Sequence, residues 1–307
     1  NMVGYDAVAL GNHEFDYGMA RAKAIIKEAD FPYVSCNWVD LRTGLRVLPA
    51  VKLFPAGGKW IAFVGITTPE SFTKSTPAYF MNAKQTKYIY DILGGDDGRK
   101  LYDAVQKAID KAKTLGADII IGLGHLGVDP SSSPWTSEEV IANTTGFDAF
   151  IDGHSHSTFS ETIKDKSGKE VVFEQTGTKL ANVGKIIIKA DGTITHENVD
   201  LNTVEPDAEA AAYIQTITDK FDALQKQVVA KTSVELTING ADGKRAVRNA
   251  ETNLGDLCAD AYRILLGADI AFVNGGGVRD NIKGETADLQ ELSRRPSGLR
   301  KTRFSSN

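Results

Sequence analysis

The sequence predicts a layered α/β fold, in which helices cover a sheet of buried strands, and three observations indicate this class. Short apolar runs alternate along the chain with segments whose apolar residues recur at intervals of three and four. The run over 118–123 is apolar enough for a strand that is buried on both faces. The chain has 307 residues, and the 42% that are hydrophobic are ample for ordinary cores.

The first half of the chain alternates strand and helix. Apolar residues at helical spacing predict helices over 19–29 and 101–115, which Pro32 and Gly116 end. The region 69–98 predicts a loop with a short helix. The predicted strands of this half are the apolar runs 7–10, 33–35, 60–66, 118–123 and 147–151.

The second half predicts fewer strands and two more helices. The runs 171–175 and 185–188 predict late strands, and 268–273 predicts a further one. Apolar spacing over 206–228 predicts a helix that connects two domains, and a last amphipathic helix carries the residues 257–265.

Composition excludes several classes of protein. A net charge of −5 gives no general attraction to nucleic acid or to an anionic membrane. Cys36 and Cys258 are too few and too far apart for a disulfide framework or a thiolate metal site. No apolar stretch is long enough to span a bilayer, and residues 1–5 do not resemble a signal peptide.

Polar residues follow three of the predicted strands at the points where those strands end. These residues are Asn12 with His13, then His125, then His154 with His156. Ligands and catalytic groups collect beyond the carboxyl ends of strands in an open α/β sheet, so these side chains could share one site. A neutral imidazole suits a transition metal or a proton transfer, and an amide oxygen can also bind a metal. In an extended segment His154 and His156 would point to the same side.

Each of these residues also has a local, structural interpretation. Asn12 could cap a helix, and Glu14 and Asp16 could complement its dipole. Alternatively, Asp16 could orient the ring of His13. Four of the five histidines follow apolar strands, which favours a shared functional site. The fifth, His196, lacks this context and is interpreted as a surface strand residue.

The blocks 11–16, 124–125 and 153–156, in this order, resemble signature blocks of the calcineurin-like metallophosphoesterases, specifically of the two-domain 5′-nucleotidase family. The resemblance covers nearly the whole chain, to about residue 285. It implies a four-layer α/β/β/α metallophosphoesterase domain followed by a partial α/β C-terminal domain that binds the nucleotide. The implied boundaries are a catalytic domain over 1–203, a connecting helix over 204–230 and a partial substrate-binding domain over 231–307.

The resemblance also implies roles for individual residues. One divalent ion would be bound by Asn12, His125 and His154, and a second by His156. His13, paired with Asp16, would be the catalytic histidine that stabilises the phosphoryl transition state or protonates the leaving oxygen. The two ions would be Zn, Mn or Co, which can hold phosphate oxygens and lower the pKa of a bridging water.

The chain departs from the family pattern at its start. Family members begin with a strand that bears an Asp-x-His pair and then a Gly-Asp pair whose aspartate bridges both metals, and residues 1–10 contain neither pair. A hydroxide that bridges two ions about 3.5–4 Å apart is hard to assemble without these ligands. We therefore expect the chain alone to have lost most or all turnover and to hold at most one ion, weakly.

Two blocks of the C-terminal part, 248–257 and 274–279, also match the family. Glycines that expose backbone N–H groups beside an arginine can hold an anion. The resemblance implies that Arg248 and Arg279 contact phosphate or ribose, and that Asn274 and Gly276 contact the base. From about residue 286 the chain reads as an aberrant, solvated tail without the stacking aromatic residues of the family. Nucleotide affinity should then be poor, because stacking contributes roughly 1–3 kcal/mol per base.

Two classes of function follow from these residues. The first is a hydrolase that converts nucleoside 5′-monophosphates or related nucleotides to nucleoside and phosphate, in the periplasm, the cell wall or the extracellular space, as the resemblance implies. Relatives with the same blocks also include 2′,3′-cyclic-nucleotide phosphodiesterases, UDP-sugar hydrolases and sulfur-compound hydrolases. The second class is a non-catalytic fragment that binds a metal or a nucleotide. A nucleotide is the expected partner in both classes, and the sequence does not determine the oligomeric state.

Overall fold

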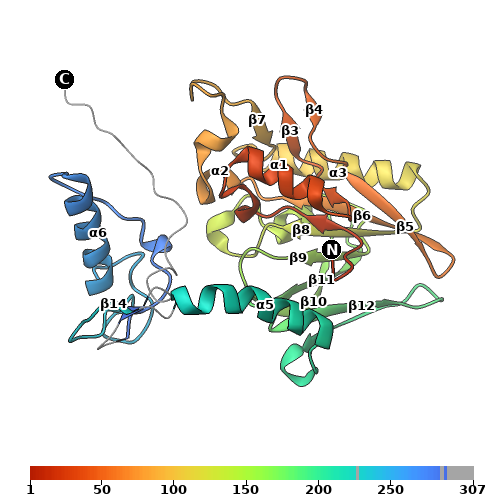
Figure 1. The fold of residues 1–307 in the computed structure, drawn as a ribbon. Helices are drawn as coiled ribbons and strands as arrows, with labels where there is room; N and C mark the ends of the chain where they lie inside the picture. Colours follow the sequence, from red (N-terminus) through yellow and green to blue (C-terminus); the bar gives the residue numbers. More distant parts are fainter. Residues whose placement is uncertain (226–227, 284–286, 289–307) are drawn as a thin grey trace. The chain divides into compact units, whose positions relative to one another are not determined.

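The computed structural model describes residues 1–225, 228–283 and 287–288 (Figure 1). The chain divides into two compact units, residues 1–205 and 206–307. The predicted boundaries at 203 and 230 remain predictions, and the tail predicted from about residue 286 lies, apart from residues 287–288, outside the described residues.

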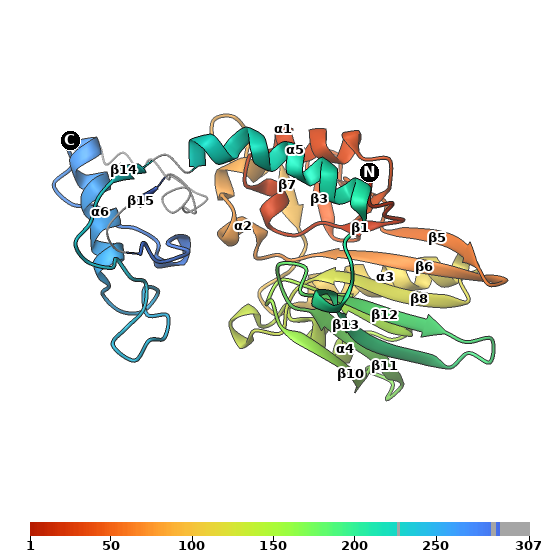
Figure 2. The same cartoon turned by 60° about the horizontal axis from the view of Figure 1, so that its bottom comes forward.

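A six-stranded sheet forms the centre of the first unit. Its strand order is β10-β11-β9-β8-β6-β5, and Figure 2 shows β5, β6 and β8 side by side. The inner strands β6, β8, β9 and β11 run parallel, whereas β5 and β10 pair antiparallel at the two edges. The strands are β5 (Val51–Ala56), β6 (Lys59–Thr67), β8 (Ile119–His125), β9 (Ala149–Asp152), β10 (Thr158–Lys164) and β11 (Glu170–Thr176). The predicted runs 60–66, 118–123, 147–151 and 171–175 are thereby confirmed as strands.

Helices cover one face of this sheet, and a β-hairpin covers the other. The helices α3 (Arg99–Thr114) and α4 (Ser137–Asn143) pack on the first face, and the fully buried side chains there include Val64, Ile66, Leu101, Val105, Ile109, Val140 and Phe150. The hairpin of β12 (Asn182–Ile188) and β13 (Ile194–Asp200) packs on the second face through Ile186, Ile188 and Ile194. The α/β class is confirmed, and the four-layer arrangement remains a prediction.

A third cluster of buried side chains lies under helix α1 (Met19–Glu28). The short strands β1 (Val8–Ala9) and β2 (Tyr33–Val34) pair in parallel beside it. The region 69–98 holds more structure than predicted: the helix α2 (Ser71–Lys74), the 3-10 turn Pro77–Phe80 and a strand, β7 (Tyr90–Ile92). Strand β7 pairs with β3 (Trp38–Asp40), which also pairs with β4 (Leu45–Arg46). The loop prediction for 90–92 is therefore wrong.

The second unit holds two helices, α5 (Ala208–Gln225) and α6 (Asn253–Leu266), which confirms helices in both predicted segments. Val228 belongs to β14 (Val228–Ala230), which pairs with β15 (Ala287–Asp288), so the prediction that the first helix reaches Val228 is wrong. The predicted strand over 268–273 is also absent from the described residues, where Phe272 is 92% exposed. None of the helices in the described ranges combines the length and hydropathy that a bilayer-spanning segment requires.

Candidate active site

Side chains that follow strands β1, β6, β8 and β9 lie together at one edge of the first unit. The Oδ1 atom of Asn12 lies 3.1 Å from Nε2 of His125. The ring centroids of His125 and His154 are 5.0 Å apart. His13 and His156 are also close enough to act electrostatically on His125. The structure therefore brings the four histidines that follow predicted strands into one cluster with Asn12.

Parallel strands explain part of this convergence: β6, β8 and β9 are neighbours in one sheet, so their carboxyl ends meet at the same edge. Strand β1, which precedes Asn12, pairs with β2 in a separate two-stranded sheet. His125 is the last residue of β8 and is in register with Thr67, the last residue of β6. Two glycines leave room for its ring. A Cβ atom at Gly11 would lie 2.8 Å from both Cε1 and Nε2 of His125, and one at Gly153 would lie 3.2 Å from Nδ1.

The imidazole of His125 is neutral at physiological pH. Burial, and to a smaller extent the neighbouring His154, His13 and His156, together lower its pKa to about 3, because both burial and like charges disfavour protonation. A neutral imidazole keeps one nitrogen lone pair, which is the form that binds a metal. The pKa shift is therefore in the direction that a metal ligand needs.

The side chain of Asn12 faces His125 and does not cap the following turn. The 3-10 turn His13–Phe15 begins after Asn12, but the Asn12 side chain makes no capping hydrogen bond. The backbone N–H of Gly11 donates to Oε2 of Glu14 at 2.7 Å. The capping interpretation of Asn12 is therefore wrong.

His13 and Asp16 form the pair that the resemblance implies. Nδ1 of His13 lies 2.7 Å from Oδ2 of Asp16. Their side chains are 62% and 14% exposed, so the carboxylate is sheltered while the ring reaches solvent. Because an ionised carboxylate only accepts hydrogen bonds, Nδ1 carries the hydrogen in this pair. Nε2 of His13 is then the nitrogen that could meet a substrate.

The segment after β9 is not extended, so the expectation that His154 and His156 alternate as in a strand is wrong. Their φ angles are 82° and 59°, in the left-handed region that non-glycine residues rarely adopt. Gln175 holds this segment: its Nε2 donates to the carbonyl of Gly153 at 3.0 Å, and its Oε1 accepts from the backbone of Ser157 at 2.7 Å. Left-handed residues cluster at functional sites, because the surrounding structure must hold them there.

Asp152 fixes the turn that follows His125. Its carboxylate accepts hydrogen bonds from the backbone N–H groups of Leu126 and Gly127, at 2.9 and 3.0 Å, and from the amide of Gln175. Burial raises the pKa of Asp152, although these hydrogen bonds act in the opposite direction. Asp152 thus ties the end of β8 to the end of β9, the two strands that carry His125 and His154.

Glu70 also joins the cluster, although the sequence analysis did not select it. Its Oε2 lies 2.8 Å from Nε2 of His154 and 2.7 Å from the hydroxyl of Ser132. Burial raises the pKa of Glu70, but the hydrogen bonds from His154 and Ser132 and the charge of Lys74 bring it below its ordinary value. Glu70 follows strand β6 by three residues, so the rule that selected the histidines could have found it.

The cluster contains donors that suit one metal ion. In the described part of the chain, no group of three or more His, Cys, Asp or Glu side chains has an arrangement that could hold a metal. Asn12 is not one of these four residue types. Its amide oxygen and the imidazoles of His125 and His154 together provide three neutral donors. Such donors fit a borderline ion such as Zn, Mn or Co. No bridging carboxylate stands among them, and a second ion would need one.

The predicted substrate residues of the second unit gather at the 3-10 turn Gly275–Gly277. Oδ1 of Asn274 accepts from the backbone N–H of Gly276 at 3.1 Å, and Nη1 of Arg279 donates to the Gly276 carbonyl at 3.1 Å. A Cβ atom at Gly276 would lie 3.5 Å from the guanidinium of Arg248. The structure therefore brings Arg248, Asn274, Gly276 and Arg279 together.

A third arginine that the sequence analysis missed belongs to this group. Burial lowers the pKa of Arg245, and the positive charges of Arg248 and Arg279 lower it further. Its Nη2 donates to the carbonyl of Val278 at 2.8 Å. Three guanidinium groups around one glycine turn create a local positive potential in an acidic chain, which suits an anionic ligand. The sequence could have indicated Arg245 through its position three residues before Arg248, which the resemblance had already selected.

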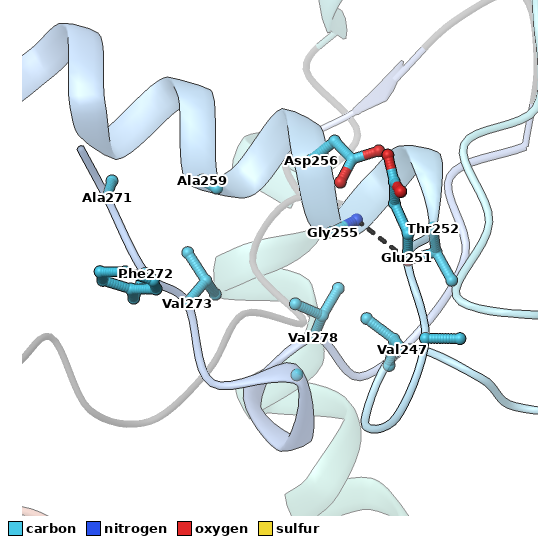
Figure 3. Close-up of a pocket in the computed structure, with 12 residues that line it drawn as sticks. Val247, Glu251, Thr252, Gly255, Asp256, Ala259, Ala271, Phe272, Val273 and Val278 are labelled. Carbon is cyan, nitrogen blue, oxygen red and sulfur yellow. Dashed lines mark hydrogen bonds between the residues drawn. The ribbon is translucent and has the colours of Figure 1, made fainter. Parts of the chain in front are cut away.

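A pocket lies beside this turn, between the start of α6 and the segment 271–273 (Figure 3). Val247, Val273 and Val278 line its apolar side, and the carboxylates of Glu251 and Asp256 line its polar side. Thr252 caps α6 there by accepting from the Gly255 N–H at 3.2 Å. Of the turn itself only Gly275 lines the pocket, and the predicted substrate residues do not.

Comparisons with known proteins agree with this geometry. A model of the 5′-nucleotidase C-terminal domain matches residues 228–293. The chain is 28% identical to Protein UshA of Escherichia coli over 97% of its own length and 59% of that protein's length. It is 26% identical to Endonuclease YhcR of Bacillus subtilis, over 92% of this chain and 23% of that protein. The chain thus spans less than two thirds of these relatives.

The chain is also similar to the solved structure of a 5′-nucleotidase. The structure of a 5′-nucleotidase precursor from Thermus thermophilus matches with a TM-score of 0.73 and 25% sequence identity, over 95% of this chain and 58% of that one. With 95% of this chain covered, the match extends into both units. Together with the C-terminal domain model and the relatives, it shows that the chain is similar to 5′-nucleotidases over most of its length.

Proposed function

We propose that this chain is the metal-binding and nucleotide-binding part of a phosphoesterase that hydrolyses nucleoside 5′-monophosphates or related nucleotides to nucleoside and phosphate. The observation that carries the proposal is the convergence of Asn12, His125 and His154 at one sheet edge, with the His13–Asp16 pair in the same cluster. The similarity of the chain to 5′-nucleotidases supports phosphoester chemistry at this edge.

In this proposal Asn12, His125 and His154 would hold one divalent ion, and His156 would contribute to a second ion only where the other ligands of a dinuclear site are present. When bound, such ions polarise phosphoryl oxygens and lower the pKa of a coordinated water. The chain's own residues do the rest. Asp16 keeps the hydrogen on Nδ1 of His13, so that Nε2 can hold or deliver a proton at the leaving oxygen.

In the second unit, Arg248 and Arg279 would hold the phosphate or ribose, while Asn274 and Gly276 would hold the base. Arginine suits this role because its planar fork can bind two phosphate oxygens at once. The net charge of −5 supports a small nucleotide rather than a nucleic acid as the partner. We propose a location outside the cytoplasm, as the family resemblance implies.

One observation favours a second candidate function. The amide oxygen of Asn12 and the imidazoles of His125 and His154 are neutral donors. The carboxylates described beside them are engaged by other groups: Asp16 contacts His13, and Glu70 contacts His154 and Ser132, so neither is free to bridge two ions. A unit that binds a metal or a nucleotide without turnover would need no such bridge. The two functions therefore differ in hydrolysis and not in binding.

The test combines metal binding with phosphate release. We expect isothermal titration with Mn²⁺ to show one weak site that His125→Ala abolishes and that His196→Asn, outside the cluster, leaves unchanged. Release of phosphate from AMP that depends on both Mn²⁺ and His13 would support the hydrolase, and binding without release would support the second function. Absence of Mn²⁺ binding to the wild-type chain would overturn the metal centre.

A further inference from the structure

A buried carboxylate holds one nitrogen of His154. Glu70 is 8% exposed, and its Oε2 lies 2.8 Å from Nε2 of His154, which stands 84 positions further along the chain. The same oxygen accepts from the hydroxyl of Ser132 at 2.7 Å. Oε1 of Glu70 lies 3.5 Å from Nζ of Lys74. Both oxygens of the carboxylate thus have partners, and the shortest two contacts converge on Oε2.

The chemistry of the pair decides which nitrogen of His154 carries hydrogen. An ionised carboxylate has no hydrogen to donate, so Nε2 of His154 must be the donor in this contact. In a neutral imidazole with a hydrogen on Nε2, the lone pair lies on Nδ1. Nδ1 is then the only ring nitrogen of His154 that can bind a cation.

We propose that Glu70 is a positioning residue for His154: its carboxylate holds the ring in the Nε2–H tautomer and thereby leaves Nδ1 to the cation that His125 and Asn12 also face. This inference rests on the proposed metal centre. Imidazoles that bind metals commonly donate their other N–H to a carboxylate, which fixes the tautomer and the ring orientation.

A purely structural role for Glu70 is the competing explanation. Glu70 precedes helix α2, and it could serve only to start that helix or to tie it to Ser132. However, its side chain makes no capping hydrogen bond to α2. The left-handed backbone of His154 is disfavoured for a non-glycine residue, so surrounding contacts must hold it. The contact of Glu70 with the ring is one of these, beside the contacts of Gln175 with the backbone.

The first measurement reads the tautomer directly, without any metal. In ¹⁵N-labelled protein, long-range proton–nitrogen spectra distinguish Nε2–H from Nδ1–H, and the variant His154→Asn assigns the signals. We expect the Nε2–H form at His154 in the wild-type chain and in Glu70→Gln, whose amide oxygen can still accept. In Glu70→Ala we expect a mixture. Lys74→Ala, which alters only the exposed partner of the other oxygen, is the matched control and should keep the Nε2–H form.

The second measurement is the Co²⁺ affinity, by titration, of the wild-type chain and of the variants Glu70→Ala, Glu70→Gln and Lys74→Ala. Thermal unfolding verifies that each protein is folded. Loss of the outer partner of a metal-binding imidazole typically costs about 10–100-fold in affinity. We expect a loss in that range for Glu70→Ala, recovery of most of it in Glu70→Gln, and a change of less than about twofold for Lys74→Ala.

The outcomes separate this inference from the proposed function. Co²⁺ binding by a wild-type chain whose His154 is in the Nδ1–H form would overturn the role of Glu70 and leave the metal centre standing. Unchanged affinity and an unchanged tautomer in folded Glu70→Ala would do the same. A wild-type chain with the Nε2–H form that binds no Co²⁺ would overturn the metal centre and, with it, the purpose proposed for Glu70.

Discussion

The amide oxygen of Asn12 and Nε2 of His125 lie 3.1 Å apart, although 113 positions separate the two residues. Asn12 is 3% exposed, and a buried polar group without a partner is costly. In the absence of an ion, each of these groups therefore satisfies the other. An amide oxygen cannot donate, so Nε2 of His125 carries the hydrogen in this contact. A cation bound by both atoms would take the place of that hydrogen, which would then lie on Nδ1.

The position of the His125 ring should change when a single methyl group is added at Gly11. In Gly11→Ala the new methyl group would lie 2.8 Å from Cε1 and Nε2, closer than carbon and nitrogen can approach. The ring must move away from Asn12, and we expect Mn²⁺ affinity to fall by about tenfold or more, as for loss of a supporting contact. Isothermal titration with Mn²⁺ measures this change.

Gly153→Ala is the matched control, because its methyl group would meet Nδ1 of the same ring at 3.2 Å, a contact that a small shift relieves. We expect a smaller loss of Mn²⁺ affinity than in Gly11→Ala, and similar melting temperatures for both variants. Equal affinities in Gly11→Ala and the wild-type chain would contradict the placement of His125.

The central strands and long helices could be predicted from the sequence because their signals are local. Strand β8 is a continuous apolar run, and helix α3 repeats apolar residues at helical spacing until Gly116, whose φ of 86° ends it as expected. The meeting of His125 and His154 could be predicted because β8 and β9 are parallel neighbours, whose carboxyl ends lie at one edge. The approach of Asn12 could not be predicted in this way, because β1 pairs with β2 in a separate two-stranded sheet.

The remaining features depend on partners far away in the sequence. Strand β7 has three residues and exists because β3 pairs with it. The segment 268–273 is apolar, yet no described strand pairs with it, and Ile270 remains 70% exposed. The place of Glu70 after β6 could have been predicted, but its contact with His154, 84 positions away, could not. Apolar patterns carry no information on such contacts, which is why these features escaped prediction.

The arginine group of the second unit should be disturbed by a substitution at Gly275 and should tolerate one at Gly276. In Gly275→Ala the methyl group would overlap the carbonyl oxygen of Val247, so the turn must open. In Gly276→Ala the nearest atoms, Oδ1 of Asn274 and Cζ of Arg248, would be at 3.4 and 3.5 Å, which is ordinary contact.

We therefore expect Gly275→Ala to lower the unfolding free energy by about 1–3 kcal/mol, in the range of overpacked sites, and to weaken AMP binding. Gly276→Ala should change the unfolding free energy by less than about 0.5–1 kcal/mol, close to the cost of one ordinary helix substitution. Urea unfolding and AMP titration measure both quantities. A Gly276→Ala protein less stable than Gly275→Ala would contradict the described turn.

Cys36 should resist modification until the first unit unfolds. Its side chain is fully buried, and burial raises the pKa of the thiol to about 12. Only the thiolate reacts, and at pH 8 a thiol with that pKa is ionised in about one molecule in 10⁴. We expect Cys258→Ser, which retains Cys36, to react with a disulfide reagent only after denaturant is added. Reaction of Cys36 in the folded protein would show that this core opens readily.

Glu174 should make the first unit less stable as the pH rises. Glu174 is a fully buried residue of strand β11, and its carboxylate lies against Gly184 of the hairpin. Among the described residues, its Oε2 accepts from the Ser160 hydroxyl at 3.3 Å and its Oε1 has no hydrogen-bond partner. Burial raises the pKa of Glu174. Because the pKa is higher in the folded than in the unfolded chain, its contribution to stability is full below the unfolded value and is lost as the pH rises through the folded value.

Glu174→Gln removes this loss, because an amide has the same shape and no charge at any pH. We expect the variant to melt a few degrees above the wild-type chain at pH 8 and to lose that advantage near pH 4.5, since about 1 kcal/mol corresponds to roughly 2–4 °C in a domain of this size. Glu161→Gln, on the exposed side of β10, is the control and should follow the wild-type curve. A Glu174→Gln protein that melts below the wild-type chain at pH 8 would mean that the ionised carboxylate stabilises the hairpin, contrary to the burial described.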